Sequence, residues 1–171
     1  MNRLAIVAAL MLLAACKPGP DKLPDMALYA DGIDSLRSVI TQTGVAIDPA
    51  VSVDGRGSLR IDATGERTLV LIADVPIDAP KLPRFSYRAR LRGEKVAGRA
   101  YLEMWLTVEG KGEFFARALH SQISGTSEWA THEASFYLED GQVPKRVKLN
   151  VVVEGEGTVW VDGVTLAAGK N

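Results

Sequence analysis

The stretch VEGEGTVWVDGVTL, Val153 to Leu166, decides the fold class of this chain. Gly155 and Gly157 predict a tight hairpin turn, because glycine readily adopts the positive φ angles that such turns need. The residues that follow alternate in polarity, and a period of two is typical of a strand whose successive side chains point to opposite faces. The stretch therefore predicts a hairpin and a closing strand.

A strict alternation assigns the side chains of this closing strand to two faces. Val159 and Val161 would share one face, and the other face would carry Trp160, Asp162, Val164 and Leu166. Because Trp160 shares its face with aliphatic residues, we expect it to pack in the core. Asp162 then needs a partner, which is a calcium ion, a loop amide or an arginine.

The same alternation recurs along the chain from Ser58 onward. The runs that we expect to be strands are SLRIDA, RTLVLIADV, RFSYRARLR, AYLEMWLTV, EFFARALHSQ, EWATHEASFYL, RVKLNVVVE and TVWVDGVTL. Glycine-rich and proline-rich turns separate these runs, and many short strands at even spacing favour an antiparallel β-sandwich. The segment DGIDSLRSVIT is typical of a short helix of a turn or two, with Asp34 as its cap and its end near Ile40.

Three G-x-G triplets begin at Gly55, Gly110 and Gly155. A nucleotide-binding loop would need a third glycine and a helix whose first amides meet the phosphate. Each triplet here leads into an expected strand instead, so we interpret all three as hairpin turns.

The first 25 residues are predicted to be a targeting segment and a tether. A positive charge, a short apolar run and small residues at 1–15 are typical of a secretory signal peptide. LAAC, which ends at Cys16, resembles the bacterial lipobox, and the resemblance implies cleavage before Cys16, a diacylglyceryl thioether on its sulfur and an acylated (palmitate-type) amine. Residues 16–25 are rich in proline and charge and form the expected tether. Lys17 at the next position implies outer-membrane sorting.

The rest of the chain, 26–171, is expected to form one domain of ordinary size. Cys16 is the only cysteine, so no disulfide can form within the chain. The formal net charge is −1, with both signs interspersed and no long basic run, which argues against a nucleic-acid partner.

The best candidate for a binding site is the segment YLEMW. Period-two alternation places Tyr101, Glu103 and Trp105 on one face of a strand, where aromatic rings can stack on sugars and a carboxylate can accept hydroxyl hydrogen bonds. Arg88 and Trp129 are candidates to join from neighbouring strands. The alternative interpretation is that this face is buried and that Glu103 pairs with Arg88 or Arg90 across the sheet.

Signals for catalysis are weak. There is no G-x-S-x-G nucleophile motif, and His120 and His132 both fall in expected strands without zinc-site spacing. Glycoside hydrolysis would need Glu103 and a second carboxylate on opposite sides of a sugar bond, and the sequence brings no second carboxylate to Glu103. We therefore expect a protein that is not an enzyme.

From about Asp48 to Ala167, the segments GSLRIDA, SEW and GTVWVDGVTL resemble the galactose-binding-like jelly-roll found in many carbohydrate-binding modules. The resemblance implies a jelly-roll β-sandwich. It also implies a possible structural calcium ion, with Asp162 of the closing strand and Asp54 of a glycine loop as candidate ligands. Calcium takes six to eight oxygen ligands, and Asp31 and Asp34 are further contributors to consider.

These observations together lead to one expectation and two alternatives. We expect a lipid-anchored cell-envelope protein that carries a non-catalytic module for binding a glycan or a partner protein. The first alternative is a structural or assembly lipoprotein without a small-molecule site. The second is a glycoside hydrolase that uses Glu103.

Overall fold

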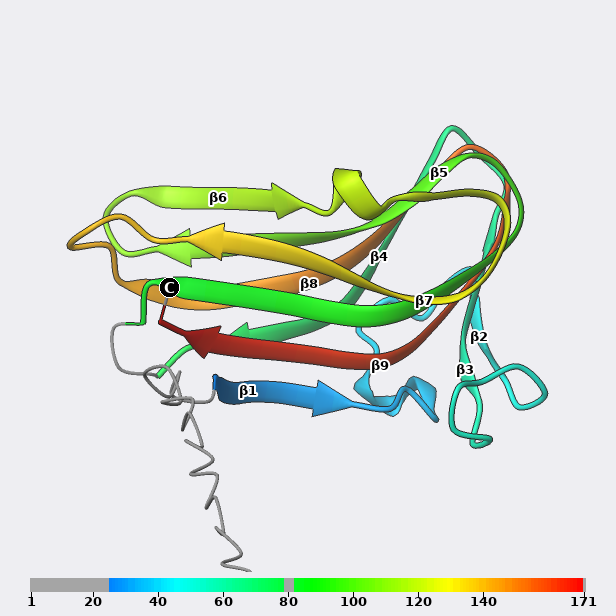
Figure 1. Cartoon of the computed structure of the whole chain (residues 1–171), viewed down its shortest axis with the longest axis horizontal. Coiled ribbons are helices and arrows are strands. Elements are labelled where there is room, and N and C mark those ends of the chain that lie inside the picture. The colour runs from blue at the N-terminus through cyan, green and yellow to red at the C-terminus, as the bar shows by residue number, and fades with distance from the viewer. Residues whose placement is uncertain (1–24, 79–81, 171) are drawn as a thin grey trace, which may run out of the picture.

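The computed structural model describes residues 25–78 and 82–170, which form an antiparallel β-sandwich (Figure 1). The front layer contains β7 (Ile123–Tyr137), the first part of β5 (Arg84–Val108), β9 (Gly157–Gly169) and β1 (Met26–Asp31). The rear layer contains β6 (Gly112–Arg117), the second part of β5, β8 (Pro144–Glu154) and β4 (Arg67–Pro76). β2 (Val45–Asp48) and β3 (Ser58–Ala63) extend the sheet from the first part of β9. The predicted fold class is confirmed.

β5 joins the two layers, and this differs from the expectation of two separate strands. It pairs with β9 as far as Glu94 and with β8 from Arg99 onward, so the strand changes layers between these residues. Gly98 lies in this segment, and a Cβ there would collide with the backbone of Glu154. The absence of a side chain at Gly98 therefore lets β5 cross against the end of β8.

The turn before β9 has the conformation that its sequence predicts. Gly155 and Gly157 have φ angles of 88° and 142°, and the other two G-x-G triplets also have positive φ at both glycines. Each triplet leads into a strand, as expected: β3, β6 or β9. A Cβ on Gly157 would lie 2.7 Å from the Cα of Val96, so this turn packs directly against the crossing segment of β5.

The closing strand β9 does not keep a strict alternation, and the predicted facing of its side chains is wrong in its second half. The register with β5 shifts between Arg88 and Arg90, next to Gly163, whose φ is 60°. The extra residue of such a bulge reverses the facing that follows. As a result the aliphatic residues of both halves are fully buried in one core, namely Val159, Val161, Val164 and Leu166.

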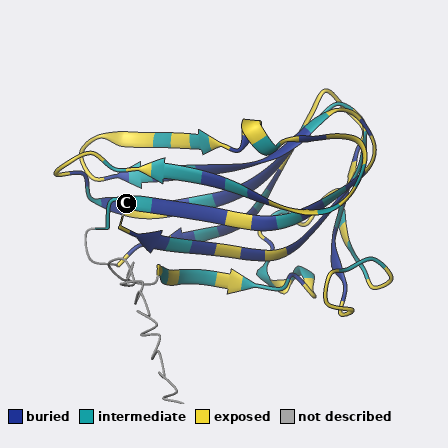
Figure 2. Ribbon diagram, in the orientation of Figure 1, coloured by how far each residue is buried: buried dark blue, intermediate teal, exposed yellow. Residues whose placement is uncertain are grey.

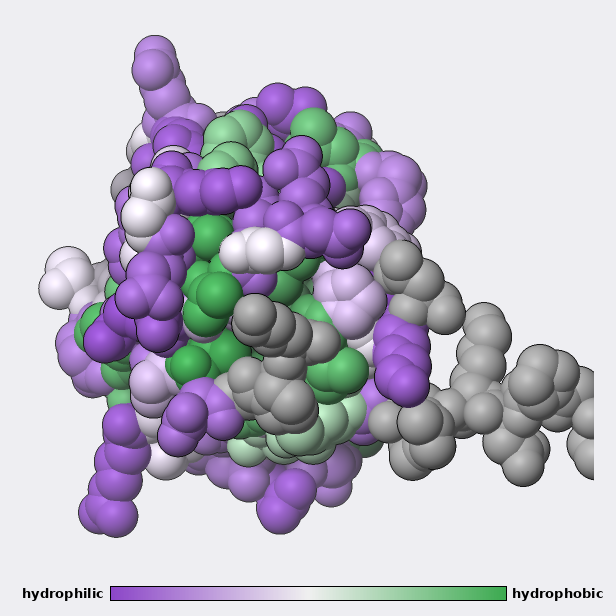
Figure 3. Space-filling view, turned by 90° about the vertical axis from the view of Figure 1, so that its left-hand side faces the viewer, coloured by the Kyte–Doolittle hydropathy of each residue, from purple (hydrophilic) through white to green (hydrophobic). Residues whose placement is uncertain are grey.

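The core lies between the layers and is formed mainly by inward residues of β3, β4, β5, β8 and β9, with contributions from β7 and the connecting segments. In Figure 2 the central strands β5 and β9 are mostly buried, while β1 and β6 at the edges are more exposed. Seen from the end of the sandwich that lies at the left in Figure 1, apolar residues fill the space between the layers and polar residues surround them (Figure 3). Burial of this apolar surface is the main source of stability for such a fold.

Several local predictions need correction. β1 and β2 precede Ser58 and were not anticipated, and the strand predicted at EFFARALHSQ ends at Arg117. The predicted helix is only a 3-10 turn, η1 (Leu36–Ser38), with Ser35 rather than Asp34 before it, because Asp34 is engaged elsewhere. His120 belongs to a second 3-10 turn, η2 (Leu119–Ser121), and only His132 lies in a strand.

The predicted signal peptide (1–15), Cys16 and nearly all of the tether (16–25) lie outside the described residues. Within the described part of the chain, no helix is long and apolar enough to cross a membrane.

Candidate functional site

The outward side of the rear layer brings together the polar and aromatic residues most suited to binding. We call this surface the rear face. Its side chains come from β4, β8, β5 and β6, which the antiparallel ladders place side by side. The main ones are Leu69 and Leu71 on β4, Lys148 and Asn150 on β8, Tyr101, Glu103 and Trp105 on β5, and Glu113, Phe115 and Arg117 on β6.

Trp105 is partly exposed on this face and is held in a defined orientation. Its indole N–H donates a 2.8 Å hydrogen bond to Oε1 of Glu103. Phe115, which is 51% exposed, lies beside it with ring centroids 5.4 Å apart and planes inclined by 36°. The guanidinium of Arg117 lies 4.6 Å from the centre of the Phe115 ring. The pair therefore forms an anchored aromatic surface.

Glu103 is fully buried at the foot of this aromatic pair. Its Oε2 accepts a 2.5 Å hydrogen bond from Nε of Arg117, and Nη2 of Arg67 lies 3.6 Å from its Oε1. The expected pairing with Arg88 or Arg90 is wrong, because those residues belong to the front layer. Both oxygens of this buried carboxylate are therefore engaged by neighbouring side chains.

Tyr101 shares the face but is not a stacking surface, because only 1% of it is exposed. Its hydroxyl donates a 2.8 Å hydrogen bond to Glu154, and the Arg99 guanidinium lies 5.6 Å from its ring centre. Burial and the neighbouring Glu154 carboxylate raise the pKa of Tyr101. Tyr101 is therefore part of the support beneath the face.

A hollow of about 300 Å³ lies beside Trp105 on the rear face and is lined by Leu69, Leu71, Trp105, Glu113, Lys148 and Asn150. Nζ of Lys148 donates a 2.8 Å hydrogen bond to Glu113, and this bond lowers the pKa of the Glu113 carboxyl. Asn150 is only 3% exposed and lines the hollow. Its side-chain amide has both donor and acceptor atoms, so it can bind a polar ligand group there.

Sequence reasoning missed Leu69, Leu71, Lys148, Asn150 and Phe115. The alternation of RVKLNVVVE places Lys148 and Asn150 on one face, and this signal was available. The pairing of β8 with both β4 and β5, which brings these residues next to Trp105, was not visible in the sequence.

The remaining predicted members, Arg88 and Trp129, lie in the front layer and do not join the rear face. Arg88 donates a 2.7 Å hydrogen bond to Glu133, which also accepts hydrogen bonds from Ser86 and Ser135. Burial opposes ionisation of Glu133, but these donors outweigh it and lower its pKa to about 2. Arg88 is therefore occupied by an ion pair within its own layer.

Trp160 is buried, as expected, but on the outward side of the front layer rather than in the core. Its indole N–H donates a 2.9 Å hydrogen bond to Asp48, and this bond lowers the pKa of the Asp48 carboxyl. The guanidiniums of Arg60 and Arg92 lie 5.9 and 5.6 Å from its ring centre. These arginines cover the ring, so Trp160 has a structural role and is not available for stacking on a ligand.

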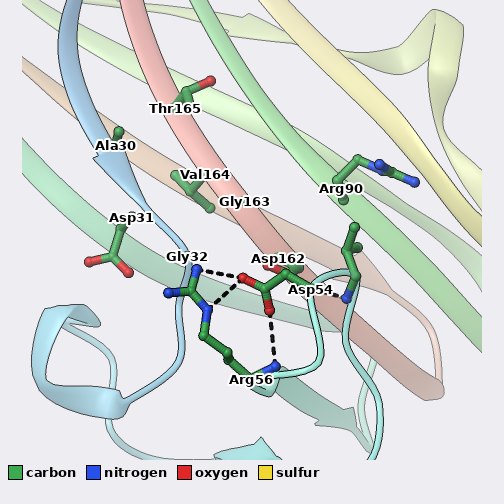
Figure 4. Close-up of a pocket in the computed structure, with 11 residues that line it drawn as sticks. Ala30, Asp31, Gly32, Asp54, Arg56, Arg90, Asp162, Gly163, Val164 and Thr165 are labelled. Carbon is green, nitrogen blue, oxygen red and sulfur yellow. Dashed lines mark hydrogen bonds and ion pairs between the residues drawn. The ribbon is translucent and has the colours of Figure 1, made fainter.

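Asp162 lines a second hollow, of about 390 Å³, between β1, β9 and the loop before β3 (Figure 4). Its Oδ2 accepts a 2.7 Å hydrogen bond from the backbone N–H of Val53. Burial raises the pKa of the Asp162 carboxyl, and the nearby carboxylates of Asp54 and Asp34 add to this effect. The partner of Asp162 is thus a loop amide, one of the three alternatives expected.

The residues around Asp162 do not fit a calcium ion. Arg56 donates 2.8 and 2.6 Å hydrogen bonds to Oδ2 of Asp54 (Figure 4), and its Nε lies 3.5 Å from Oδ2 of Asp34. Within residues 25–78 and 82–170, no group of three or more histidine, cysteine, aspartate or glutamate side chains could hold a metal ion. The cation among these carboxylates is the Arg56 guanidinium.

Comparison with known proteins gives no family by sequence: no protein-family model matches the chain, and no curated protein matches it. The fold does have solved counterparts. The CBM22-1 xylan-binding domain from Paenibacillus barcinonensis Xyn10C superimposes with a TM-score of 0.58 at 12% identity, over 86% of this chain and 97% of that one. A xylan-binding domain from CBM 22 gives 0.59 at 11% identity, over 89% and 99%.

A family 30 carbohydrate binding module superimposes with a TM-score of 0.54 at 13% identity, over 85% of this chain and 99% of that one. At such low identities the likeness shows the fold alone. The chain therefore has a β-sandwich of the kind found in carbohydrate-binding modules.

Proposed function

We propose that this protein is a glycan-binding module whose site is the rear face. The observation that carries the proposal is that a partly exposed, hydrogen-bonded Trp105 lies beside a hollow lined by the polar side chains of Lys148 and Asn150. Aromatic rings stack on the apolar faces of sugar rings, and a few fixed polar groups orient the ligand. The similarity of the fold to carbohydrate-binding modules supports the same function.

In this arrangement a sugar chain lies across the strands of the rear layer. Trp105 and Phe115 stack on its rings, and Leu69 and Leu71 form the apolar wall on β4. Asn150 and the Lys148–Glu113 pair donate to and accept from sugar hydroxyls.

The test is a binding screen of the purified protein against soluble polysaccharides, including xylan and galactan. Trp105→Ala should reduce the affinity for the bound glycan at least about tenfold, since stacking and hydrogen-bond anchoring are both lost. The matched control is Tyr137→Ala, which removes a 58% exposed ring from the front layer and should leave binding unchanged. Equal loss in both variants, or no loss in Trp105→Ala with unchanged far-UV circular dichroism, would exclude this site.

A second candidate function uses the same surface to dock an envelope protein. The exposed apolar side chains of Leu69 (43%) and Phe115 (51%) favour it, because such residues mark interaction surfaces when they are grouped. The candidate predicts that no glycan in the screen binds and that Leu69→Asp abolishes association with a protein partner identified by cross-linking.

The cellular location belongs to the same proposal. The lipobox-like LAAC segment supports lipidation of Cys16, and the proline-rich tether that follows would hold the module close to the outer membrane. Cys16→Ser should release the protein from the membrane fraction. A Cys16→Ser protein that stays in the membrane fraction would contradict the anchor and leave glycan binding untouched.

A further inference from the structure

Beside the hollow on the rear face, three arginines surround two glutamates. We call Arg67, Arg99, Arg117, Glu103 and Glu154 the arginine cluster. β8 pairs with both β4 and β5 here, so that Glu154 lies opposite Arg67 on one side and Arg99 on the other. The cluster contains three positive and two negative charges and therefore has one positive charge in excess.

The two carboxylates already have strong partners other than Arg67. Glu154 accepts hydrogen bonds from Arg99 (2.6 Å) and from the Tyr101 hydroxyl (2.8 Å). Glu103 accepts hydrogen bonds from Arg117 and from the Trp105 indole. Among the described residues Arg67 forms a 3.6 Å ion pair with Glu103, and its charge also acts on Glu154, yet its side chain is 46% exposed. The excess charge is thus located on Arg67.

Each of the other cations named on the rear face is paired with one carboxylate. Lys148 is paired with Glu113 at 2.8 Å, and Arg146 with Asp74 at 2.8 Å. The whole chain has a formal charge of −1, so the positive excess is a local property of this face. Arg67 lies two residues before Leu69 on the same side of β4, about 7 Å away along the strand. Its guanidinium can therefore reach a ligand in the hollow.

We propose that the glycan bound at the rear face is acidic and that Arg67 binds the carboxylate of a uronic acid residue. A guanidinium presents a planar pair of donors that matches a carboxylate in two parallel hydrogen bonds. Trp105 and Phe115 stack on the sugar rings of the glycan, while Arg67 binds its carboxylate. This inference rests on the proposed function and adds the class of ligand to it.

The experiment compares one polysaccharide with and without its charge. Polygalacturonate and its methyl ester share a backbone, and only the first carries free carboxylates. The wild-type protein should bind polygalacturonate about tenfold more tightly than the ester, and the difference should shrink as salt is raised. Dextran sulfate separates this recognition from general attraction to polyanions, and it should bind no more tightly than the ester.

Two variants assign the preference to Arg67. Arg67→Gln should bind polygalacturonate and its ester equally, and Arg67→Lys should recover only part of the preference, because lysine lacks the planar fork. The matched control is Arg146→Gln, which removes a 52% exposed arginine of the same face that is paired with Asp74. It should retain the preference.

The outcomes separate this inference from the proposed function. If a neutral glycan binds as tightly as polygalacturonate and Trp105→Ala abolishes that binding, the rear face is a glycan site and the acidic class is wrong. If Arg67→Gln keeps the full preference, Arg67 is not the selecting residue and the inference fails. If no glycan binds the wild-type protein, the proposed function and the inference fail together.

Discussion

The indole N–H of Trp105 is hydrogen-bonded to the carboxylate of Glu103, two residues earlier on the same side of β5, and Glu103 itself is fully buried. The carboxylate is in turn held by Arg117 of β6. Two strands thus fix the orientation of the Trp105 ring. In the proposed glycan site Glu103 would act through Trp105, so it would be a positioning residue.

Replacing Glu103 tests this arrangement. Glu103→Ala should destabilise the protein by about 3 to 5 kcal/mol, because it leaves the arginine without its buried partner. It should also weaken glycan binding, and Glu103→Gln, which can still accept from the indole, should recover most of the binding. Denaturant unfolding and titration with the glycan measure the two effects. The control Glu113→Gln breaks an exposed pair and should cost less than about 1 kcal/mol.

We expect the protein to lose stability in mild acid because of His132. It is buried, its Nδ1 is hydrogen-bonded to the Ser121 carbonyl of η2, and its Nε2 has no partner among the described residues. Burial lowers its pKa, so the folded state resists protonation while the unfolded state accepts it near pH 6.5. Stability from this group is therefore present above about pH 6.5 and falls as the pH drops, by at most about 1.4 kcal/mol per pH unit.

The measurement is the free energy of unfolding between pH 7 and pH 5. His132→Gln, which keeps a hydrogen-bonding side chain but does not titrate, should show a flatter profile. His120→Gln, a change at an exposed residue of η2 whose charge contributes least to the lowered pKa of His132, should flatten the profile far less than His132→Gln does. A His132→Gln profile as steep as that of the wild type would contradict the prediction.

We expect a separate loss of stability at lower pH, caused by protonation of Glu133. Its folded pKa of about 2 lies below the usual value of 4.5, so its contribution is present above about pH 4.5 and disappears as the pH falls toward 2. Because the carboxylate is partly exposed, we expect only about 1 to 2 kcal/mol after solvent screening. Glu133→Gln should be less stable than the wild type at pH 6 and equally stable at pH 2, as measured by urea unfolding. A constant difference at both pH values would count against this assignment.

We expect calcium to have little effect on the stability of the protein because of Arg56. Since its guanidinium already lies between Asp54 and Asp34, neither excess calcium nor a chelator should change the melting temperature of the wild type by more than about 1 °C. Arg56→Met should lower the melting temperature, because the carboxylates near Asp162 lose their cation, and added calcium should restore part of it. A marked rise of the wild-type melting temperature with calcium would show that the metal binds despite Arg56.

We expect that adding a single methyl group at Gly157 strongly destabilises the fold. In Gly157→Ala the new Cβ would lie 2.7 Å from the Cα of Val96, 2.8 Å from the carbonyl oxygen of Lys95 and 2.9 Å from the N of Val96, and all three are backbone atoms that cannot move aside. We expect a destabilisation of about 3 kcal/mol or more. Gly110→Ala is the matched control, since its φ is also positive but open space surrounds it, and it should cost about 1 kcal/mol. Equal unfolding free energies for the two variants would rule out crowding at the crossing of β5.

The sequence alone determined most of the strands after Ser58, the glycine turns and the fold class, because alternation and turn residues are local signals. It also pointed to Trp105, whose place on the polar side of its strand follows from period two. Only the tertiary structure decided that the bulge at Gly163 brings Val164 and Leu166 into the core, and that Trp160 is covered by arginines.

Only the tertiary structure, likewise, decided which residues gather around Trp105. Asn150 and Arg67 are distant from it in the sequence and reach it because β8 pairs with β4 and β5 at once. Arg88 and Trp129 share the same polar and aromatic chemistry but lie in the other layer. Strand pairing over long separations is a cooperative property of the whole sandwich, so no local pattern could select one set over the other.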